Sequence, residues 1–267
     1  MPLEWKFLPK SNYADDEAVL FHPFRAVEVV ESVLLGDPSG FLGSLRGRLR
    51  LRYEETFYRR RRAGTLLACA VSAFDRVQLE HRTLGGVSLW EFRCALFWSV
   101  EAALVRTGRR PTHRRGLVVL RDALRQLGAE TLHDAALDAF GAGDWTPGTV
   151  RFLWTRLRER LRTASVEAAH PYLAPGRLPL WDAGFNELIR EGNAREAALL
   201  VWTLLALCWT TLPPTEREPL VEIWKGCGME RPYGVRNRIE AARRWFAGLR
   251  AVLDADESVS GVVLDDE

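Results

Sequence analysis

The segment 46–62 holds eight arginines and three aromatic rings, the densest group of side chains in this sequence that could do chemistry. Guanidinium groups bind phosphate oxygens and aromatic rings stack on bases, so this segment could bind phosphate or RNA. A solvated helix face, partly neutralised by Glu54 and Glu55, would have the same composition, and the sequence leaves both interpretations open. The candidate phosphate- or nucleic-acid-binding residues are Arg48, Arg52, Arg59 and Arg60.

Two histidines follow an arginine at a spacing similar to that of HEPN ribonucleases, where an Arg precedes a His by four to six residues. The pairs are Arg76 with His81 and Arg106 with His113. The residue after each Arg is Val or Thr, whereas those enzymes use a polar Asn, Asp or His there. His113 is therefore a candidate catalytic residue, and its alternative role is to cap the helix that follows it.

Other residue types that usually form catalytic or metal sites lack the required spacing. The five histidines and four cysteines are scattered, so the sequence predicts no metal site. Gly43-Ser44 with Glu54-Glu55 loosely resembles the Gly-Ser turn and carboxylates of nucleotidyltransferases. Those carboxylates must alternate along a strand to face one Mg²⁺ pair, whereas these two are adjacent in a segment of helical period. We therefore interpret this match as a coincidence.

The elements that must position these side chains are mainly helices. Apolar residues recur at three- and four-residue steps along most of the chain, which predicts a mainly α fold built of multi-helix bundles. The expected domains are a helical bundle at 25–164, a Pro- and Gly-rich linker at 165–180, a second helical subdomain at 181–253 and an acidic tail at 254–267.

The N-terminal residues 1–24 have a different pattern. Apolar and charged side chains alternate from Leu3 to Phe7, which predicts a short strand with one covered face. A short apolar stretch at 18–21 then leads to His22-Pro23. The fold class is therefore mainly α with a short residual β segment at the N-terminus.

Composition limits the function classes and the compartment. The chain has 267 residues, 47% of them hydrophobic, and a formal net charge of +2, which gives no general attraction to nucleic acid. Its longest apolar run, 197–211, is shorter than the roughly 20 residues of a membrane span, so we expect a buried core helix and no membrane partner. Unpaired cysteine spacing and the lack of a signal peptide predict a cytoplasmic protein.

One local pattern carries a family resemblance. In the segment 97–113 an apolar helix ends at Gly108, and Pro111-Thr112-His113 starts the next helix. This turn resembles HEPN-like helical bundles, including the substrate-binding helical regions of polymerase-β-like nucleotidyltransferases of the aminoglycoside (kanamycin-type) kind. The order of strand, loop, 19–23 segment and helices is similar to the end of such a catalytic domain, although His22 stands where that family often has Asp.

The resemblance implies a helical acceptor- or nucleotide-binding part of a nucleotidyl-transfer enzyme. The Gly-Ser turn and the Asp-x-Asp pair of the family have no counterpart, so we expect no activity from this chain alone. Glu4 stands where the family often places a third carboxylate and is a candidate catalytic residue. Mg²⁺ and a nucleoside triphosphate are implied only if a catalytic domain is supplied upstream or in trans.

Two alternatives remain. The chain could be a non-catalytic helical binding or adaptor module, whose N-terminal strand edge pairs with a catalytic partner or a second copy. It could also be a HEPN-type ribonuclease. A small-molecule acceptor is expected for the nucleotidyl-transfer interpretation, a partner chain for the adaptor and RNA for the ribonuclease.

Overall fold

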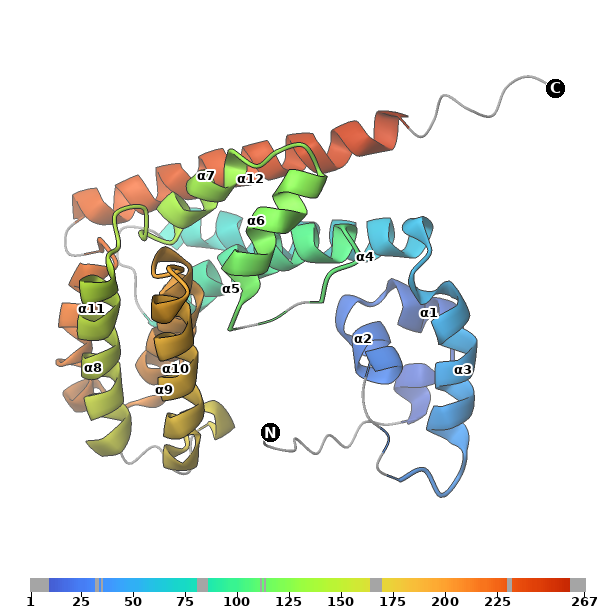
Figure 1. Ribbon diagram of the computed structural model, residues 1–267, viewed down its shortest axis with the longest axis horizontal. Coiled ribbons are helices and arrows are strands. Elements are labelled where there is room, and N and C mark those ends of the chain that lie inside the picture. The colour runs from blue at the N-terminus through green and yellow to red at the C-terminus, as the bar shows by residue number, and fades with distance from the viewer. Residues whose placement is uncertain are drawn as a thin grey trace.

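The computed structural model describes residues 10–31, 34, 36–80, 86–110, 112, 114–163, 170–229 and 232–259. Within these residues the chain forms twelve α-helices and several short 3₁₀ turns, with no strand (Figure 1). The predicted mainly α fold is confirmed. The helices form two separate hydrophobic cores, a small one near the N-terminus and a large one that takes in the rest of the described chain.

The predicted β segment at 1–24 is not seen. Residues 1–9, including Glu4 and the alternating stretch, lie outside the described residues, whereas residues 10–24 are mainly helical: η1 (Lys10–Tyr13), α1 (Asp16–Phe21) and the start of α2 (Pro23–Glu31). Asp15 accepts hydrogen bonds from the backbone N–H groups of Glu17 and Ala18 and so caps α1. His22 Nδ1 caps α2 in the same way, accepting from the N–H groups of Phe24 and Arg25 at 3.2 Å each.

The small core joins η1, α1, α2, α3 (Phe41–Tyr53) and the first turn of α4 (Thr56–Glu80). We call residues 10–62 the N-terminal unit. In Figure 1 it is the blue group of helices at one end of the molecule. Its buried apolar side chains are Tyr13, Val19, Leu20, Ala26, Val29, Val30, Leu45, Leu49, Tyr53 and Tyr58.

A buried arginine holds the N-terminal unit together. The side chain of Arg62, on α4, is only 2% exposed. Its Nη1 donates to the carbonyl of Leu20 at 3.1 Å and its Nη2 to the carbonyl of Tyr53 at 2.7 Å. These carbonyls lie at the C-terminal ends of α1 and α3, where the last turn of a helix leaves carbonyls without an intrahelical donor. Arg62 therefore supplies donors and positive charge to two helix C-termini.

The remaining helices form the main bundle around the large core, which takes in α4 from Ala63 onward. The buried Trp245 joins distant parts of it, since its Nε1 donates to the buried Ser99 Oγ at 2.7 Å. Figure 1 shows α12 running along α7 and the α4–α5 pair, while α8 to α11 group at the end opposite the N-terminal unit. The helices of the bundle after α4 are α5 (Gly86–Arg106), α6 (Gly116–Gln126), α7 (Leu132–Ala139), α8 (Pro147–Thr163), α9 (Leu178–Arg190), α10 (Ala198–Thr211), α11 (Leu220–Gly226) and α12 (Pro232–Val259).

The centre of the main bundle is α10. Every residue from Ala198 to Cys208 is buried, as the apolar run in the sequence predicted. A helix that is apolar on all sides needs partners on all sides, and α5, α8 and α11 pack around it. Among the described residues, no helix combines the length and apolar character of a membrane span.

The predicted linker at 165–180 does not divide the core. Residues 164–169 lie outside the described part, but the following residues form η4 (Pro171–Leu173), η5 (Pro175–Arg177) and the first turn of α9. Leu173 is 1% exposed and belongs to the large core, which runs from Ala63 to Leu253. The separation between cores falls within α4 instead, near Arg62. At the other end, α12 extends into the predicted acidic tail as far as Val259.

Candidate functional site

A pocket with a volume of about 140 Å³ lies between α5, α10 and the chain from His170 into α9. One wall of the pocket is a single face of α10, where lining residues recur at intervals of three and four positions: Leu200, Thr203, Leu204 and Leu207. Trp90, His170 and Tyr172 are only partly buried, so the pocket reaches the surface beside them. The lining residues are Trp90, Arg93, His170, Tyr172, Trp181, Leu200, Thr203, Leu204 and Leu207.

Hydrogen bonds fix the aromatic rings of the pocket. Trp181 Nε1 donates to the carbonyl of Tyr172 at 3.1 Å, which attaches η4 to α9. The Tyr172 N–H donates to Nδ1 of His170 at 3.2 Å, and these two rings are stacked with centroids 5.5 Å apart. Because Nδ1 accepts this bond, the neutral His170 ring carries its proton on Nε2. The segment predicted as a linker therefore supplies two of the rings that line the pocket, His170 and Tyr172.

Arg93 places a positive charge in this apolar pocket. Its side chain is 6% exposed, and its Nε and Nη2 donate to Thr203 Oγ1 at 3.4 and 3.2 Å. The guanidinium carbon lies 4.3 Å from the ring centroid of Phe97 and 5.5 Å from that of Trp90. Burial lowers the pKa of Arg93 from its ordinary value, although a guanidinium stays charged in proteins.

A second buried ionisable group, Glu101, lies two turns further along α5 and is 3% exposed. Burial raises the pKa of Glu101 to about 8, and the charge of Arg93 only partly offsets that effect. The carboxyl group is therefore mainly protonated at neutral pH. Arg93 and a neutral Glu101 thus share one face of α5, separated by Phe97.

Of the arginines that the sequence singled out, two pair with carboxylates inside the N-terminal unit. Arg48 on α3 contacts the carboxylate of Asp16 with Nε and Nη2, at 2.7 and 2.9 Å. Arg52 pairs with Glu17 at 2.5 Å. Both bonds join α3 to α1. Phosphate binding by these residues stays a prediction, but their side chains already perform a structural task.

The other two predicted phosphate-binding arginines lie on α4. The guanidinium of Arg59 lies against Gly108, in the space that a Cβ would fill. The helix end that the sequence predicts at Gly108 is confirmed, and Gly108 has a left-handed φ of 71° just after α5. Arg60 borders an open hollow of about 570 Å³ together with Arg61 and the half-exposed Phe57. Its role in RNA binding stays a prediction.

The candidate catalytic residues Glu4 and His113 lie outside the described residues, as does His81. The arginines of the two Arg–His pairs are described. Arg76 forms an ion pair with Glu91 at 2.6 Å that joins α4 to α5, and Arg106 is 8% exposed at the end of α5. The ribonuclease interpretation therefore stays a prediction.

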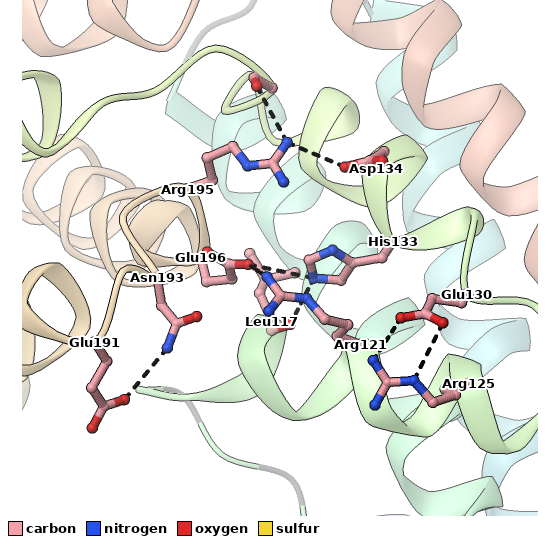
Figure 2. A network of polar contacts seen from close by, with 11 residues as sticks. Leu117, Arg121, Arg125, Glu130, His133, Asp134, Glu191, Asn193, Arg195 and Glu196 are labelled. Atoms are coloured by element: carbon pink, nitrogen blue, oxygen red, sulfur yellow. Dashed lines mark hydrogen bonds and ion pairs between the residues drawn. The ribbon is translucent and has the colours of Figure 1, made fainter.

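A network of charged side chains joins η6 (Arg195–Ala197) to α6 and α7, as Figure 2 shows. Glu196, 2% exposed, forms an ion pair with Arg121 and lies 3.9 Å from Nε2 of His133. That Nε2 donates to the carbonyl of Leu117 at 2.9 Å. Burial lowers the pKa of His133, so the ring is neutral at pH 7. The negative charge of Glu196 is compensated by Arg121 within the protein. We therefore interpret this network as a structural connection between η6, α6 and α7.

Sequence reasoning missed Arg93 and Thr203, although a signal was available. Both are polar residues that stand among apolar neighbours in largely apolar helices. Such helices are buried, and a buried polar residue is more informative than an exposed one. Tyr172 and Trp181 had no comparable signal, because the turn geometry that brings them to the pocket does not follow from periodicity.

In the part of the chain that the structure describes, no group of three or more His, Cys, Asp or Glu side chains is arranged to hold a metal ion. We take the aromatic pocket with Arg93 as the candidate functional site, because it is a largely apolar cavity with polar groups in its wall. Comparisons with protein-family models, with curated proteins and with solved structures found no match for this chain.

Proposed function

We propose that this chain is a helical binding protein that takes a small, flat, mainly apolar molecule into the pocket between α5, α10 and α9. One observation carries the proposal: a cavity of about 140 Å³ is lined by four aromatic rings and three leucines, and two of its polar groups, Arg93 and Thr203, face each other. Largely apolar cavities with a few convergent polar groups are the usual form of a small-molecule site.

The volume sets the size of the ligand. A cavity of about 150 Å³ in a protein core holds one benzene molecule, so this pocket fits a single six-membered ring with a small substituent. The rings of Trp90, Tyr172 and Trp181 offer flat apolar faces to such a molecule. A whole nucleotide is too large for it.

The size of the pocket limits the expected role as the acceptor-binding part of a nucleotidyl-transfer enzyme. A cavity of about 140 Å³ is too small for an acceptor of several rings such as an aminoglycoside. Three of the four cysteines are buried and all are free thiols, which fits the proposed cytoplasmic location.

Titration calorimetry with neutral and acidic single-ring compounds, benzamide and benzoate, tests the proposed function. We expect at least one of them to bind the full chain. The variant Leu204→Phe fills the pocket and should abolish that binding. Leu137→Phe is the matched control, because Leu137 is equally buried in the main bundle but does not line the pocket.

Thermal unfolding of the same two variants gives an independent measurement. An extra ring in a well-packed core destabilises a protein by about 1–3 kcal/mol, whereas a ring that enters an existing cavity costs less. Leu204→Phe should therefore unfold at a higher temperature than Leu137→Phe. Failure of both compounds to bind the wild-type chain would overturn the proposed function.

A further inference from the structure

We infer that the pocket selects a ring whose buried edge carries no hydrogen-bonding group, so that any polar substituent of the ligand stays at the mouth. This inference rests on the proposed function and adds the chemical class of the ligand, which is a monocyclic arene with at most one polar end. Its basis is that the polar side chains of the buried wall already bond to one another and to backbone carbonyls.

The pocket has a buried wall and a mouth that reaches the surface. The mouth is formed by the three partly buried residues Trp90, His170 and Tyr172. A polar substituent can keep its water there, whereas a polar group at the wall loses its water and needs a partner from the protein. The wall residues, each at most 6% exposed, are Arg93, Trp181, Leu200, Thr203, Leu204 and Leu207.

The hydroxyl of Thr203 is already used as donor and as acceptor. Its proton goes to the carbonyl of Leu199 at 2.7 Å, and its oxygen accepts from Nε and Nη2 of Arg93 at 3.4 and 3.2 Å. A hydroxyl has one proton and two lone pairs, so these bonds use all of them. Arg93 in turn has further interactions besides those with Thr203. The protein itself therefore engages both side chains.

The remaining side chains of the wall offer a ligand little hydrogen bonding. Trp181 has one polar hydrogen, and its Nε1 donates that hydrogen to the carbonyl of Tyr172 at 3.1 Å. The leucines of α10 contribute hydrocarbon alone. A ring nitrogen placed against these described side chains would exchange its bond to water for contacts with carbon, and that loss weakens binding.

Benzamide and isonicotinamide test this inference because they have the same shape. They differ at the ring position opposite the amide, which is a C–H group in benzamide and a nitrogen acceptor in isonicotinamide. Whichever end of isonicotinamide enters first, a polar group reaches the wall. Titration calorimetry of the full chain should therefore show benzamide binding about 5- to 100-fold more tightly, the range expected for one buried acceptor without a partner.

Replacing Thr203 tests which groups set this preference. Thr203→Val keeps the shape of the side chain and removes the oxygen that accepts from Arg93. The ring nitrogen of isonicotinamide can then accept from Nε and Nη2 in its place, so the preference for benzamide should fall by about 5-fold or more.

Thr210→Val is the matched control for the loss of a hydroxyl from α10. Thr210 also donates to a carbonyl one turn earlier, that of Ala206 at 2.9 Å, but it does not line the pocket. This variant should keep the preference of the wild type.

Equal affinities of the wild-type chain for the two compounds would overturn this inference and leave the proposed function standing, as would tighter binding of isonicotinamide. This comparison does not depend on how well a variant folds. An unchanged preference in Thr203→Val would also overturn the inference, because the bond between Thr203 and Arg93 would then not set the selectivity of the wall. If neither benzamide nor benzoate binds, the proposed function itself fails.

Discussion

Arg62 in the N-terminal unit and Arg93 in the main bundle are both buried beside an apolar core, but their described hydrogen-bond acceptors differ. Arg62 directs two of its nitrogens to the carbonyls of Leu20 and Tyr53, at the ends of two helices. Arg93 faces a threonine hydroxyl and the rings of a cavity that reaches the surface. Burial of a charged side chain therefore does not by itself identify a functional site.

The comparison shows how to separate a structural from a functional buried charge. Backbone carbonyls at helix ends are acceptors that the fold itself creates, and a buried donor there satisfies a need of the fold. Arg93 instead donates to a side-chain hydroxyl beside a cavity, so its removal alters the pocket without leaving a helix-end carbonyl unpaired. Removing Arg62 should therefore destabilise the fold more than removing Arg93.

The largest loss of stability is expected when Arg62 is replaced. Replacing it in Arg62→Met leaves two buried carbonyls without their donors, and we expect the N-terminal unit to lose about 3 kcal/mol of stability. Hydrogen exchange followed by mass spectrometry should show faster exchange in α1 to α3, with the amides of α10 unchanged. Arg61→Met is the control, because Arg61 is exposed beside Phe57 on the same helix. Unchanged protection of α1 to α3 would contradict the structural role.

The next largest change in stability is expected from Glu101, and it depends on pH. Its pKa rises from 4.5 to about 8 on folding, so between these values the folded state holds a proton that the unfolded state releases. Stability should therefore fall as pH rises through this window, by at most about 1.4 kcal/mol per unit, and level off above pH 8. Glu101→Gln removes this dependence and should be about 2 kcal/mol more stable at pH 7.5, after allowing for the buried amide.

Thermal or urea unfolding of the Glu101→Gln variant and the wild type at pH 5 and pH 7.5 checks this prediction. His133 makes the stability depend on pH with the opposite sign. Burial lowers its pKa, so stability is lost as the pH falls below the ordinary value of 6.5. That contribution is common to both proteins and cancels in their difference. A stability difference that does not grow with pH would contradict the assignment of a protonated Glu101.

A smaller effect is expected when Arg93 is removed. Its hydrogen bonds to Thr203, at 3.4 and 3.2 Å, join two side chains, so Arg93→Met leaves no helix-end carbonyl of this pair without a donor. We expect Arg93→Met to lose less stability than Arg62→Met, and thermal unfolding of both variants checks this. A loss of about 3 kcal/mol would show that Arg93 is a structural residue like Arg62 and would remove the contrast between the two regions.

The smallest effect should come from the surface pairs of the N-terminal unit. Arg48 and Asp16 are 52% and 32% exposed, and exposed pairs contribute about 0.2–1 kcal/mol. Arg48→Met should therefore lower the stability less than any of the changes above, and added salt should reduce the difference from the wild type. Arg50→Met, on the exposed side of the same helix, is the control for the loss of an arginine alone.

The helical fold could be predicted because its signals are local. The buried run of α10 and the left-handed glycine at the end of α5 follow from composition and from single residues. The residues 18–24 show the limit of this approach. A short apolar stretch followed by His-Pro suggested a strand end, whereas His22 caps a helix whose first residue is Pro23. Four apolar residues are too few to distinguish strand from helix by period.

The candidate site could not be predicted from the sequence, because its parts come from three distant segments. Arg93 and Thr203 are 110 residues apart in sequence, and only the packing of α5 against α10 brings them together. The sequence pointed instead to the arginine-rich segment 46–62 as a binding site, because its arginines are neighbours in the chain. The structure shows that Arg48 and Arg52 pair with carboxylates of α1, which lies more than 30 residues earlier.

The division into two cores also sets an order in which the protein can form during synthesis. Every residue of the small core lies between Tyr13 and Tyr58, so all of its contacts are available once Arg62 has left the ribosome. The bundle core must wait, because Ser99 on α5 meets Trp245, 146 residues later. The N-terminal unit, which looks like an appendage in Figure 1, is thus expected to be the first part of the fold to assemble.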